Sequence, residues 1–287
     1  MRRFILLLLM IMLPMYQSIT AGSENSSGTV TMLSLNVGKA DCILISVEGE
    51  HYLIDTGYKR TSEKMLAMLQ REGVQRLNGV FLTHNHKDHY GGLNALTASP
   101  ISIDAFYAPV YCIDSTGAKH QAVTAAARRG QSVNWLKAGD TVQISDSSYF
   151  EVLAPFQLNK TNENNNSLVM RLVTPEGSIL LTGDMKFEEE YELIRSGSLK
   201  ETDVLKVAFH GDNTSTSSSF LSFVKPKTAV ISTSTQEEKD TPSKETLYRL
   251  ASMGCSVYVT QDAEYAVRVK LSGGVADVAL EGLEASD

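Results

Sequence analysis

The chain has 287 residues, of which 43% are hydrophobic and 21% are charged. This composition is that of an ordinary globular protein, and it excludes a disordered or fibrous chain. The 33 acidic residues outnumber the 26 Lys and Arg residues, which gives a formal net charge of −7. A protein this acidic is a poor general binder of polyanions. We therefore expect no stable nucleic-acid partner, although nucleic acid stays open as a substrate that is contacted locally.

The N-terminus has the order of a secretory signal. Arg2 and Arg3 precede an apolar run at 4–15, and small and polar residues follow it. The run is shorter than the roughly 20 apolar residues of a membrane span. We expect a signal peptide at 1–22, with cleavage after Ala21, and a secreted or extracytoplasmic bacterial protein. An uncleaved N-terminal membrane anchor is the alternative, and no other transmembrane segment is expected. Residues 23–287 are then expected to form a single domain.

The rest of the chain alternates short β-branched runs with segments of helical periodicity. Strands outnumber helices, so the natural packing is two central sheets with helices outside them. Strands are predicted at 30–36, 41–47, 52–54, 79–82, 103–108, 141–144, 149–154, 167–174, 178–182, 203–208, 228–231, 256–260 and 265–271, and helices at 61–71, 91–97, 121–129, 186–196, 217–224 and 243–253.

The densest group of metal-ligand types follows the apolar run at 79–82. His84, His86, Asp88 and His89 fall within six residues. Side chains at this spacing cannot share one face of a strand or helix, but they can converge from a tight loop. Imidazole and carboxylate groups suit a cation such as Zn²⁺. A solvated, His-rich loop is the ordinary alternative. The position between an apolar strand and the Gly91-Gly92 pair favours a site.

Three more polar residues follow apolar strands and lie close to a glycine. They are Asp55, Asp184 and His210. An Asp near a Gly is most often part of a turn. Their shared position at the ends of strands favours convergence on one site.

The order of these motifs resembles the metallo-β-lactamase superfamily. The details resemble the metallo-β-lactamase-like domain of ComEC-type DNA-uptake competence proteins and its free-standing secreted relatives. This resemblance implies an α/β fold, the αββα four-layer sandwich of two mixed β-sheets flanked by helices. The matching segments span residues 30–272 and lie at 35–41, 55, 84–92, 165–169, 180–184, 210–215 and 257–260.

The resemblance also implies a metal site that holds one or two Zn²⁺ ions, with Mn²⁺ as an alternative. Asp88, His210 and Asp55 are the residues expected to act in catalysis, and Asp55 would do so by holding a ligand histidine through its other ring nitrogen. By position, His84 and His86 would bind the first metal, Asp88, His89 and His210 the second, and Asp184 would bridge the two.

The chain departs from the superfamily pattern in the middle. Where a third histidine ligand is usual, Asn164, Asn165 and Asn166 stand instead. Neutral Asn suits harder cations better than Zn²⁺, so a single-metal enzyme is also open. The competence branch often has His-His-Gly where this chain has Phe209-His210-Gly211, and a His before a Pro where this chain has Thr241.

The implied function is a secreted metal-dependent hydrolase. It would use a metal-activated hydroxide on a phosphodiester, either a small phosphoester or a nucleic acid. A β-lactamase or a thioesterase-type metallo-hydrolase is one alternative, and the asparagine run argues against it. A non-catalytic binding domain that keeps a partial metal site is the other. Lys59, Arg60 and Lys87 flank the expected site loops, where they either steer an anionic substrate or are ordinary solvated charges.

Overall fold

The computed structural model describes residues 29–112 and 120–282. The expected signal peptide at 1–22 lies outside these residues. In the described part of the chain, no helix combines the length and apolar character needed to cross a membrane.

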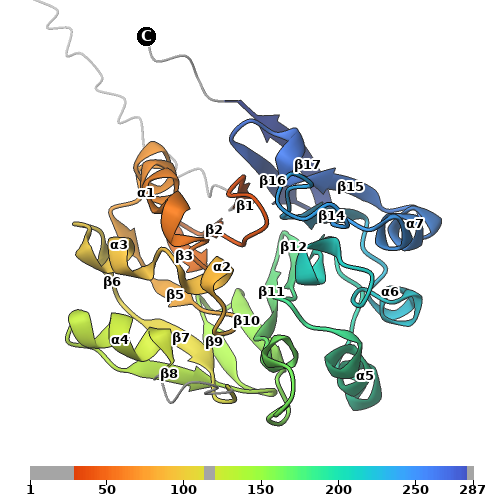
Figure 1. The fold of residues 1–287 in the computed structure, drawn as a ribbon, viewed down its shortest axis with the longest axis horizontal. Coiled ribbons are helices and arrows are strands. Elements are labelled where there is room, and N and C mark those ends of the chain that lie inside the picture. The colour runs from red at the N-terminus through yellow and green to blue at the C-terminus, as the bar shows by residue number, and fades with distance from the viewer. Residues whose placement is uncertain (1–28, 113–119, 283–287) are drawn as a thin grey trace, which may run out of the picture.

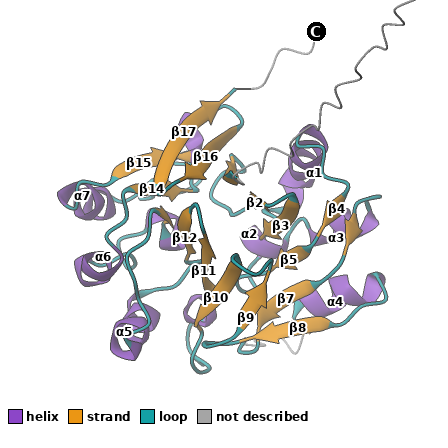
Figure 2. Ribbon diagram, turned by 180° about the vertical axis from the view of Figure 1, so that it is seen from behind, coloured by secondary structure: helices purple, strands orange, loops and turns teal. Residues whose placement is uncertain are grey.

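Two large mixed sheets form the centre of the molecule (Figure 2). In spatial order, the first contains β17 (Val275–Glu281), β16 (Ala266–Ser272), β1 (Val30–Leu35), β2 (Ile43–Val47), β3 (Glu50–Ile54), β5 (Gly79–Phe81), β7 (Phe106–Pro109) and β8 (Val133–Leu136). The second contains β15 (Ser256–Val259), β14 (Thr228–Ile231), β13 (Val204–Lys206), β12 (Gly177–Leu181), β11 (Val169–Thr174), β10 (Tyr149–Ala154) and β9 (Thr141–Gln143). A small separate pair joins β4 (Arg76–Leu77) to β6 (Ser102–Ile103).

The helices lie outside the sheets (Figure 1). On one side are α1 (Ser62–Arg71), α3 (Leu93–Ala98) and α4 (Gln121–Arg128), and on the other are α5 (Phe187–Ser196), α6 (Ser218–Val224) and α7 (Lys244–Ser252). The short α2 (Lys87–Tyr90) belongs to the histidine-rich loop. Four 3₁₀ turns complete the description: η1 (Lys59–Thr61), η2 (Glu163–Asn166), η3 (Ala208–Gly211) and η4 (Thr260–Asp262).

Three apolar cores separate these layers, because successive side chains of a strand point to opposite faces of its sheet. On β3, Leu53 packs toward α1 and its neighbours, whereas Tyr52 and Ile54 pack between the sheets. The third core joins the outer face of the second sheet to α5–α7, through residues such as Leu193 and Phe220. Helix, sheet, sheet and helix thus form four layers, which confirms the predicted αββα sandwich.

The structure corrects the element prediction in several places. It adds the short strand β4, and it divides the strand predicted at 103–108 into β6 and β7. The loop after β5 contains the short helix α2. The edge strands β8 and β17 were missed, and in both the exposed positions break the apolar runs that mark a buried strand. The C-terminal strands β16 and β17 also return to the first sheet, where β16 pairs with β1. That pairing depends on contacts between the two ends of the described chain, which local periodicity does not report.

Candidate metal centre

The polar residues predicted to converge do so at one edge of the two sheets. β3 runs parallel to β5, and β12 runs parallel to β13. The carboxyl ends of parallel strands meet at the same edge of a sheet, a common place for sites. Asp55 directly follows β3, and Asp184 comes shortly after β12. The histidine loop follows β5 and His210 lies in η3, just after β13.

Four of the expected ligands form a compact cluster. Asp88, His89, Asp184 and His210 each offer a ligand atom, and these atoms all lie within 4.8 Å of one another. His89 and His210 are fully buried, Asp184 is almost so, and the side chain of Asp88 is 21% exposed. Its exposure leaves the cluster open to solvent on that side.

Three buried atoms in the cluster lack a hydrogen-bond partner in the described part of the chain. They are Nε2 of His89, Nε2 of His210 and Oδ1 of Asp184. Nε2 of His89 lies 3.3 Å from Oδ2 of Asp184, and Nε2 of His210 lies 3.5 Å from the same oxygen. Leaving buried polar atoms unpaired is costly. Nitrogen and carboxylate groups that face one another without partners therefore fit a bound divalent cation.

The other nitrogen of each imidazole is already hydrogen-bonded. Nδ1 of His210 lies 2.9 Å from the carbonyl oxygen of Ser232, which only accepts, so Nδ1 must carry the proton. Nδ1 of His89 lies 2.7 Å from Oδ2 of Asp55. In both neutral rings the lone pair is then on Nε2, which points into the cluster. Such outer contacts fix the tautomer and orientation of metal-ligating histidines.

Asp55 is held firmly in this role. Its carboxylate accepts hydrogen bonds from the backbone N–H of Thr83 at 2.8 Å and from the Thr83 hydroxyl at 2.7 Å. Its backbone lies in the left-handed region, with φ of 57°. Phe209 and His210 share that conformation, with φ of 46° and 54°. Such conformations are unfavourable for residues other than glycine and cluster at functional sites.

His84 and His86 lie beside the cluster and form a pair. Nε2 of His84 is 2.9 Å from Nδ1 of His86 and 3.7 Å from Oδ2 of Asp184. The two imidazoles thus direct one nitrogen each toward a common point. This arrangement fits the predicted first metal position, with Asp184 placed between the two pairs of histidines.

Three asparagines stand where a third histidine ligand is usual, and two of them have side chains that are hydrogen-bonded elsewhere. Asn165 binds Glu188 and the backbone N–H of Lys186, and Asn166 binds the backbone of Asn159. Their side chains are therefore occupied within their own surroundings. Asn164 keeps a buried Oδ1 that has no partner among the described residues.

The cluster strongly perturbs the ionisation of its members. Burial lowers the pKa of His210, but Asp184 and Asp88 outweigh it and raise the pKa to about 9. Burial raises the pKa of Asp184, but His210 and His89 outweigh it and hold the pKa well below its ordinary value. For His84, burial and the nearby His89 lower the pKa well below the ordinary value. Without a cation, protons shared between carboxylates and imidazoles supply the compensating positive charge.

Sequence reasoning gave no role to Asp41 or Lys206. Lys206 of β13 is 1% exposed, and its Nζ lies 3.0 Å from the carboxylate of Asp41 and 3.0 Å from the carbonyl oxygen of Val207. Asp41 also lies within 4.8 Å of ligand atoms of Asp55 and His89. Lys206 already compensates the charge of Asp41. We therefore interpret the group of Asp41, Asp55 and His89 as a support for the metal-binding cluster and not as a second metal site. The signal in the sequence was a lysine inside the apolar run at 204–209.

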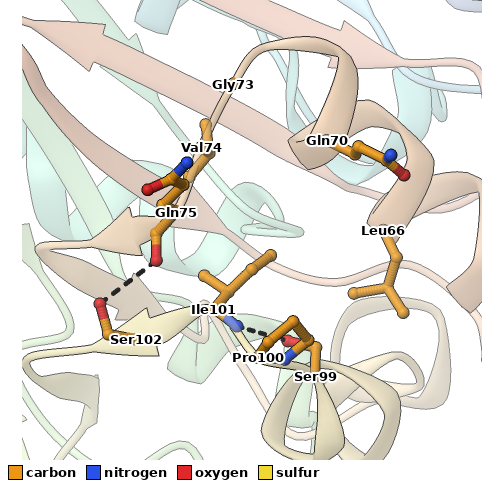
Figure 3. A pocket seen from close by; sticks show the side chains of 9 residues that line it. All are labelled: Leu66, Gln70, Gly73, Val74, Gln75, Ser99, Pro100, Ile101 and Ser102. Atoms are coloured by element: carbon orange, nitrogen blue, oxygen red, sulfur yellow. Dashed lines mark hydrogen bonds between the residues drawn. The ribbon is translucent and has the colours of Figure 1, made fainter.

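A separate hollow of 760 Å³ lies beside α1 and α3 (Figure 3). None of its lining residues is titratable, and it shares none with the cluster, so it has no acid, base or ligand for chemistry. Its lining comprises Leu66, Gln70, Gly73, Val74, Gln75, Ser99, Pro100, Ile101 and Ser102.

Comparisons with known proteins agree with this geometry. A profile of the metallo-beta-lactamase superfamily matches residues 35–235. The chain therefore belongs to the metallo-beta-lactamase superfamily and has the fold of its metal-dependent hydrolases. The predicted superfamily and the predicted class of enzyme, a metallo-hydrolase, are therefore confirmed.

The more particular likeness is to competence proteins. The chain is 29% identical over 245 residues to ComE operon protein 3 of Bacillus subtilis, covering 79% of this chain and 31% of that protein. It is 31% identical over 200 residues to the competence protein ComA of Neisseria gonorrhoeae, covering 69% of this chain and 26% of that protein. The chain thus spans about a third or less of the curated relatives that it matches. The predicted likeness to the ComEC-type domain is confirmed.

Solved structures share the fold at low identity. Igni18, a metallo hydrolase of Ignicoccus hospitalis, aligns with a TM-score of 0.52 at 14% identity, over 88% of this chain and 98% of that one. A diphosphatase of the PhnP family aligns with a TM-score of 0.51 at 13% identity, over 85% of this chain and 98% of that one. These likenesses support the fold.

Proposed function

We propose that the protein is a phosphodiesterase that works with one or two divalent cations held by the cluster. In this proposal, His84 and His86 hold the first cation, and Asp88, His89 and His210 hold the second. The carboxylate of Asp184, which lies near both His84 and His89, would help to hold both cations. The observation that carries the proposal is the convergence of the unpartnered Nε2 atoms of His89 and His210 on the Asp184 carboxylate.

Divalent cations at this position would activate a water molecule and stabilise negative charge on a phosphoryl oxygen. The protein's own residues provide the rest. Asp55 and the Ser232 carbonyl hold Nδ1 of His89 and His210, so that Nε2 of each ring is aimed inward and would be the nitrogen that binds the cation. In this proposal the substrate enters on the side of Asp88, whose side chain is 21% exposed. Zn²⁺ suits the imidazoles, and Mn²⁺ is the alternative because the carboxylates of Asp88 and Asp184 also suit a harder cation.

The likeness to the competence protein ComA and to the ComEC-type domain supports a phosphodiester as the bond that is cleaved, because DNA uptake brings a protein into contact with a polymer of phosphodiesters. The test is a substrate screen on the purified protein loaded with Zn²⁺ or Mn²⁺. It compares bis(p-nitrophenyl) phosphate and a labelled oligonucleotide with a chromogenic cephalosporin and a thioester. We expect phosphodiester cleavage that disappears in His86→Ala and His210→Ala.

The proposal fails if no phosphodiester is cleaved faster than in His86→Ala. Faster turnover of the cephalosporin or thioester would establish the alternative hydrolase. Elemental analysis gives an independent readout, and fewer than one bound metal ion per chain would favour a non-catalytic binding domain.

We also propose that the protein is exported by the segment at 1–22. The competence relatives support an extracytoplasmic or membrane-associated role. N-terminal sequencing of protein recovered from the producing cells should begin at Gly22. An intact N-terminus in the membrane fraction would instead show an uncleaved anchor.

A further inference from the structure

A pocket with three basic residues in its lining adjoins the metal centre. Its volume is 360 Å³, within the range of roughly 300–1,000 Å³ typical of ligand sites. Three of its nine lining residues are basic and none is acidic, although the chain as a whole carries a net charge of −7. The lining comprises Tyr58, Lys59, Arg60, Lys87, Tyr90, Gly91, Leu93, Asn94 and Gln121.

Two glycines bring these basic residues together from different elements. A Cβ at Gly91 would lie 2.4 Å from the backbone N of Lys59 and 2.6 Å from the carbonyl oxygen of Lys87. A Cβ at Gly92 would lie 2.4 Å from the carbonyl oxygen of Thr56. Only glycine permits this close approach of two backbones. The Gly91-Gly92 pair therefore lets η1 pack directly on α2, which places Lys59 and Lys87 in one pocket.

The positive charge of the pocket is largely uncompensated. Lys59 and Lys87 are exposed, and neither forms an ion pair with any residue in 29–112 or 120–282. Arg60 is paired with Glu237 at 2.5 Å and lies over the ring of Tyr58, with Cζ 3.8 Å from the ring centroid. Two lysine charges thus remain available to an anion, and Arg60 is fixed between an acid and an aromatic ring.

The pocket also lies next to the reacting centre. Lys87 stands between His86 and Asp88 in the chain, on the helix that carries Asp88 and His89. The segment that leads to Tyr58 on the pocket wall is tied to the cluster, because the backbone N–H of Thr56 donates to the carbonyl oxygen of His89 at 2.6 Å. An anion in the pocket would therefore be a near neighbour of a group held at the cluster.

We propose that this pocket binds a second phosphate group of the substrate, next to the phosphodiester that is cleaved. The inference rests on the proposed function of the cluster and narrows its substrate class to compounds with at least two phosphates. A terminal phosphate on a short nucleotide and an internal phosphate of a longer strand present the same chemistry to Lys59, Arg60 and Lys87.

A binding measurement tests the pocket without catalysis. The probe is a fluorescent single strand of about 12 nucleotides, within the site sizes of single-strand binders, and its anisotropy is measured in EDTA at several salt concentrations. In the Lys59→Ala/Arg60→Ala/Lys87→Ala protein we expect roughly tenfold weaker binding. The slope of log affinity against log salt should be smaller by about 0.7 for each phosphate that the variant no longer neutralises. A matched control removes three exposed lysines elsewhere, in Lys160→Ala/Lys200→Ala/Lys270→Ala.

The proposal is overturned if the pocket variant binds as the parent protein does, if the control loses as much affinity, or if the parent protein does not bind the strand. This measurement does not depend on hydrolysis, so it stands even if the proposed phosphodiesterase activity fails. Circular dichroism of both variants checks that they fold, and Lys87→Glu alone provides a second, milder variant.

A kinetic measurement then identifies the source of the phosphate. Two ratios are measured. The first is kcat/KM for a 5′-phosphorylated dinucleotide divided by kcat/KM for bis(p-nitrophenyl) phosphate, and the second is kcat/KM for the longer strand divided by the same value. A drop in both ratios in the pocket variant supports binding of any second phosphate. A drop for the strand alone supports an internal phosphate of a polynucleotide. Unchanged ratios would contradict the proposal.

Discussion

Lys206 and Asp41 form a buried ion pair that links the two sheets beside the metal centre. Lys206 lies on β13 of the second sheet, and Asp41 lies just before β2 of the first. Replacing Lys206 with Met would leave the Asp41 carboxylate buried and uncompensated near Asp55. We expect a loss of about 3–5 kcal/mol in the free energy of unfolding, as for other broken buried pairs. Urea denaturation of the metal-free protein measures it.

The matched control removes both charges. In Asp41→Asn/Lys206→Met no buried charge is left unpaired, so most of the lost stability should return. If the double variant is as unstable as Lys206→Met, the packing of the lysine stem rather than its charge is what matters.

This pair marks one limit of what the sequence could predict. The cluster of Asp55, His84 to His89, Asp184 and His210 was predictable, because each group follows an apolar strand and the order of groups resembles a known family. The role of Lys206 depends on the presence of Asp41 across the interface between the sheets. No local pattern reports that contact, and a charged residue within a strand is ordinarily assigned to a solvent-facing position.

The asparagine run shows a second limit. The sequence placed Asn164, Asn165 and Asn166 where a ligand is usual, and it could not say where each side chain points. In the structure, Asn165 is hydrogen-bonded to Glu188 of helix α5, and Asn166 to Asn159 of the preceding loop. The fold was easier to predict, because periodicity marks buried strands well and exposed edge strands such as β8 poorly.

Asp55 should control metal affinity through His89. In Asp55→Ala, Nδ1 of His89 loses its partner at 2.7 Å, and the ring is free to rotate or to change tautomer. We expect metal affinity to fall by about 10–100-fold, the usual effect of removing such an orienting group. Competition with a fluorescent zinc chelator measures it. Asp55→Asn should be less severe, since it can still accept a hydrogen bond from Nδ1, and equal losses in the two variants would contradict this account.

Metal removal should lower stability, and His210 should be required for the effect. A cation that binds only the folded protein raises the free energy of unfolding by about 2.7 kcal/mol when its free concentration is one hundred times its dissociation constant. Zn²⁺ should therefore raise the melting temperature of the parent protein after chelator treatment. His210→Ala removes one ligand from the four-residue cluster, so the rise should be much smaller. An equal rise in this variant would place the stabilising cation elsewhere.

Gly91 should be essential to the junction of η1 and α2. In Gly91→Ala the new methyl group would meet the backbone of Lys59, Lys87 and Gly57, at 2.4, 2.6 and 2.7 Å. Backbone atoms cannot move aside as a flexible side chain can, so we expect a loss of about 1–3 kcal/mol, as for other overpacked sites. Thermal unfolding measures it. Gly130→Ala is a control for a glycine with open space around it, although its φ of 67° carries a strain of its own.

His120 should make stability depend on pH below neutrality. Burial lowers its pKa to about 4, against an ordinary value of 6.5. Between these values the unfolded chain takes up a proton at His120 and the folded protein does not. The contribution of this residue is therefore fully present above pH 6.5 and is lost as pH falls toward 4. The slope should be on the order of 1 kcal/mol for each pH unit.

His120→Asn isolates this effect, because it keeps a side chain that can cap α4. In the parent protein Nδ1 of His120 accepts a hydrogen bond from the backbone N–H of Ala122, and Asn is a favoured residue at this position. Between pH 6.5 and 4, the stability of the variant should decline less than that of the parent protein. At pH 8, the substitution should change the stability little by comparison. Urea unfolding in EDTA at each pH removes bound cations from both proteins, and the titration of the ligand residues cancels because the parent protein and the variant share them. If the free energies of unfolding of the parent protein and the variant, plotted against pH, give parallel curves, then His120 does not titrate as its burial requires.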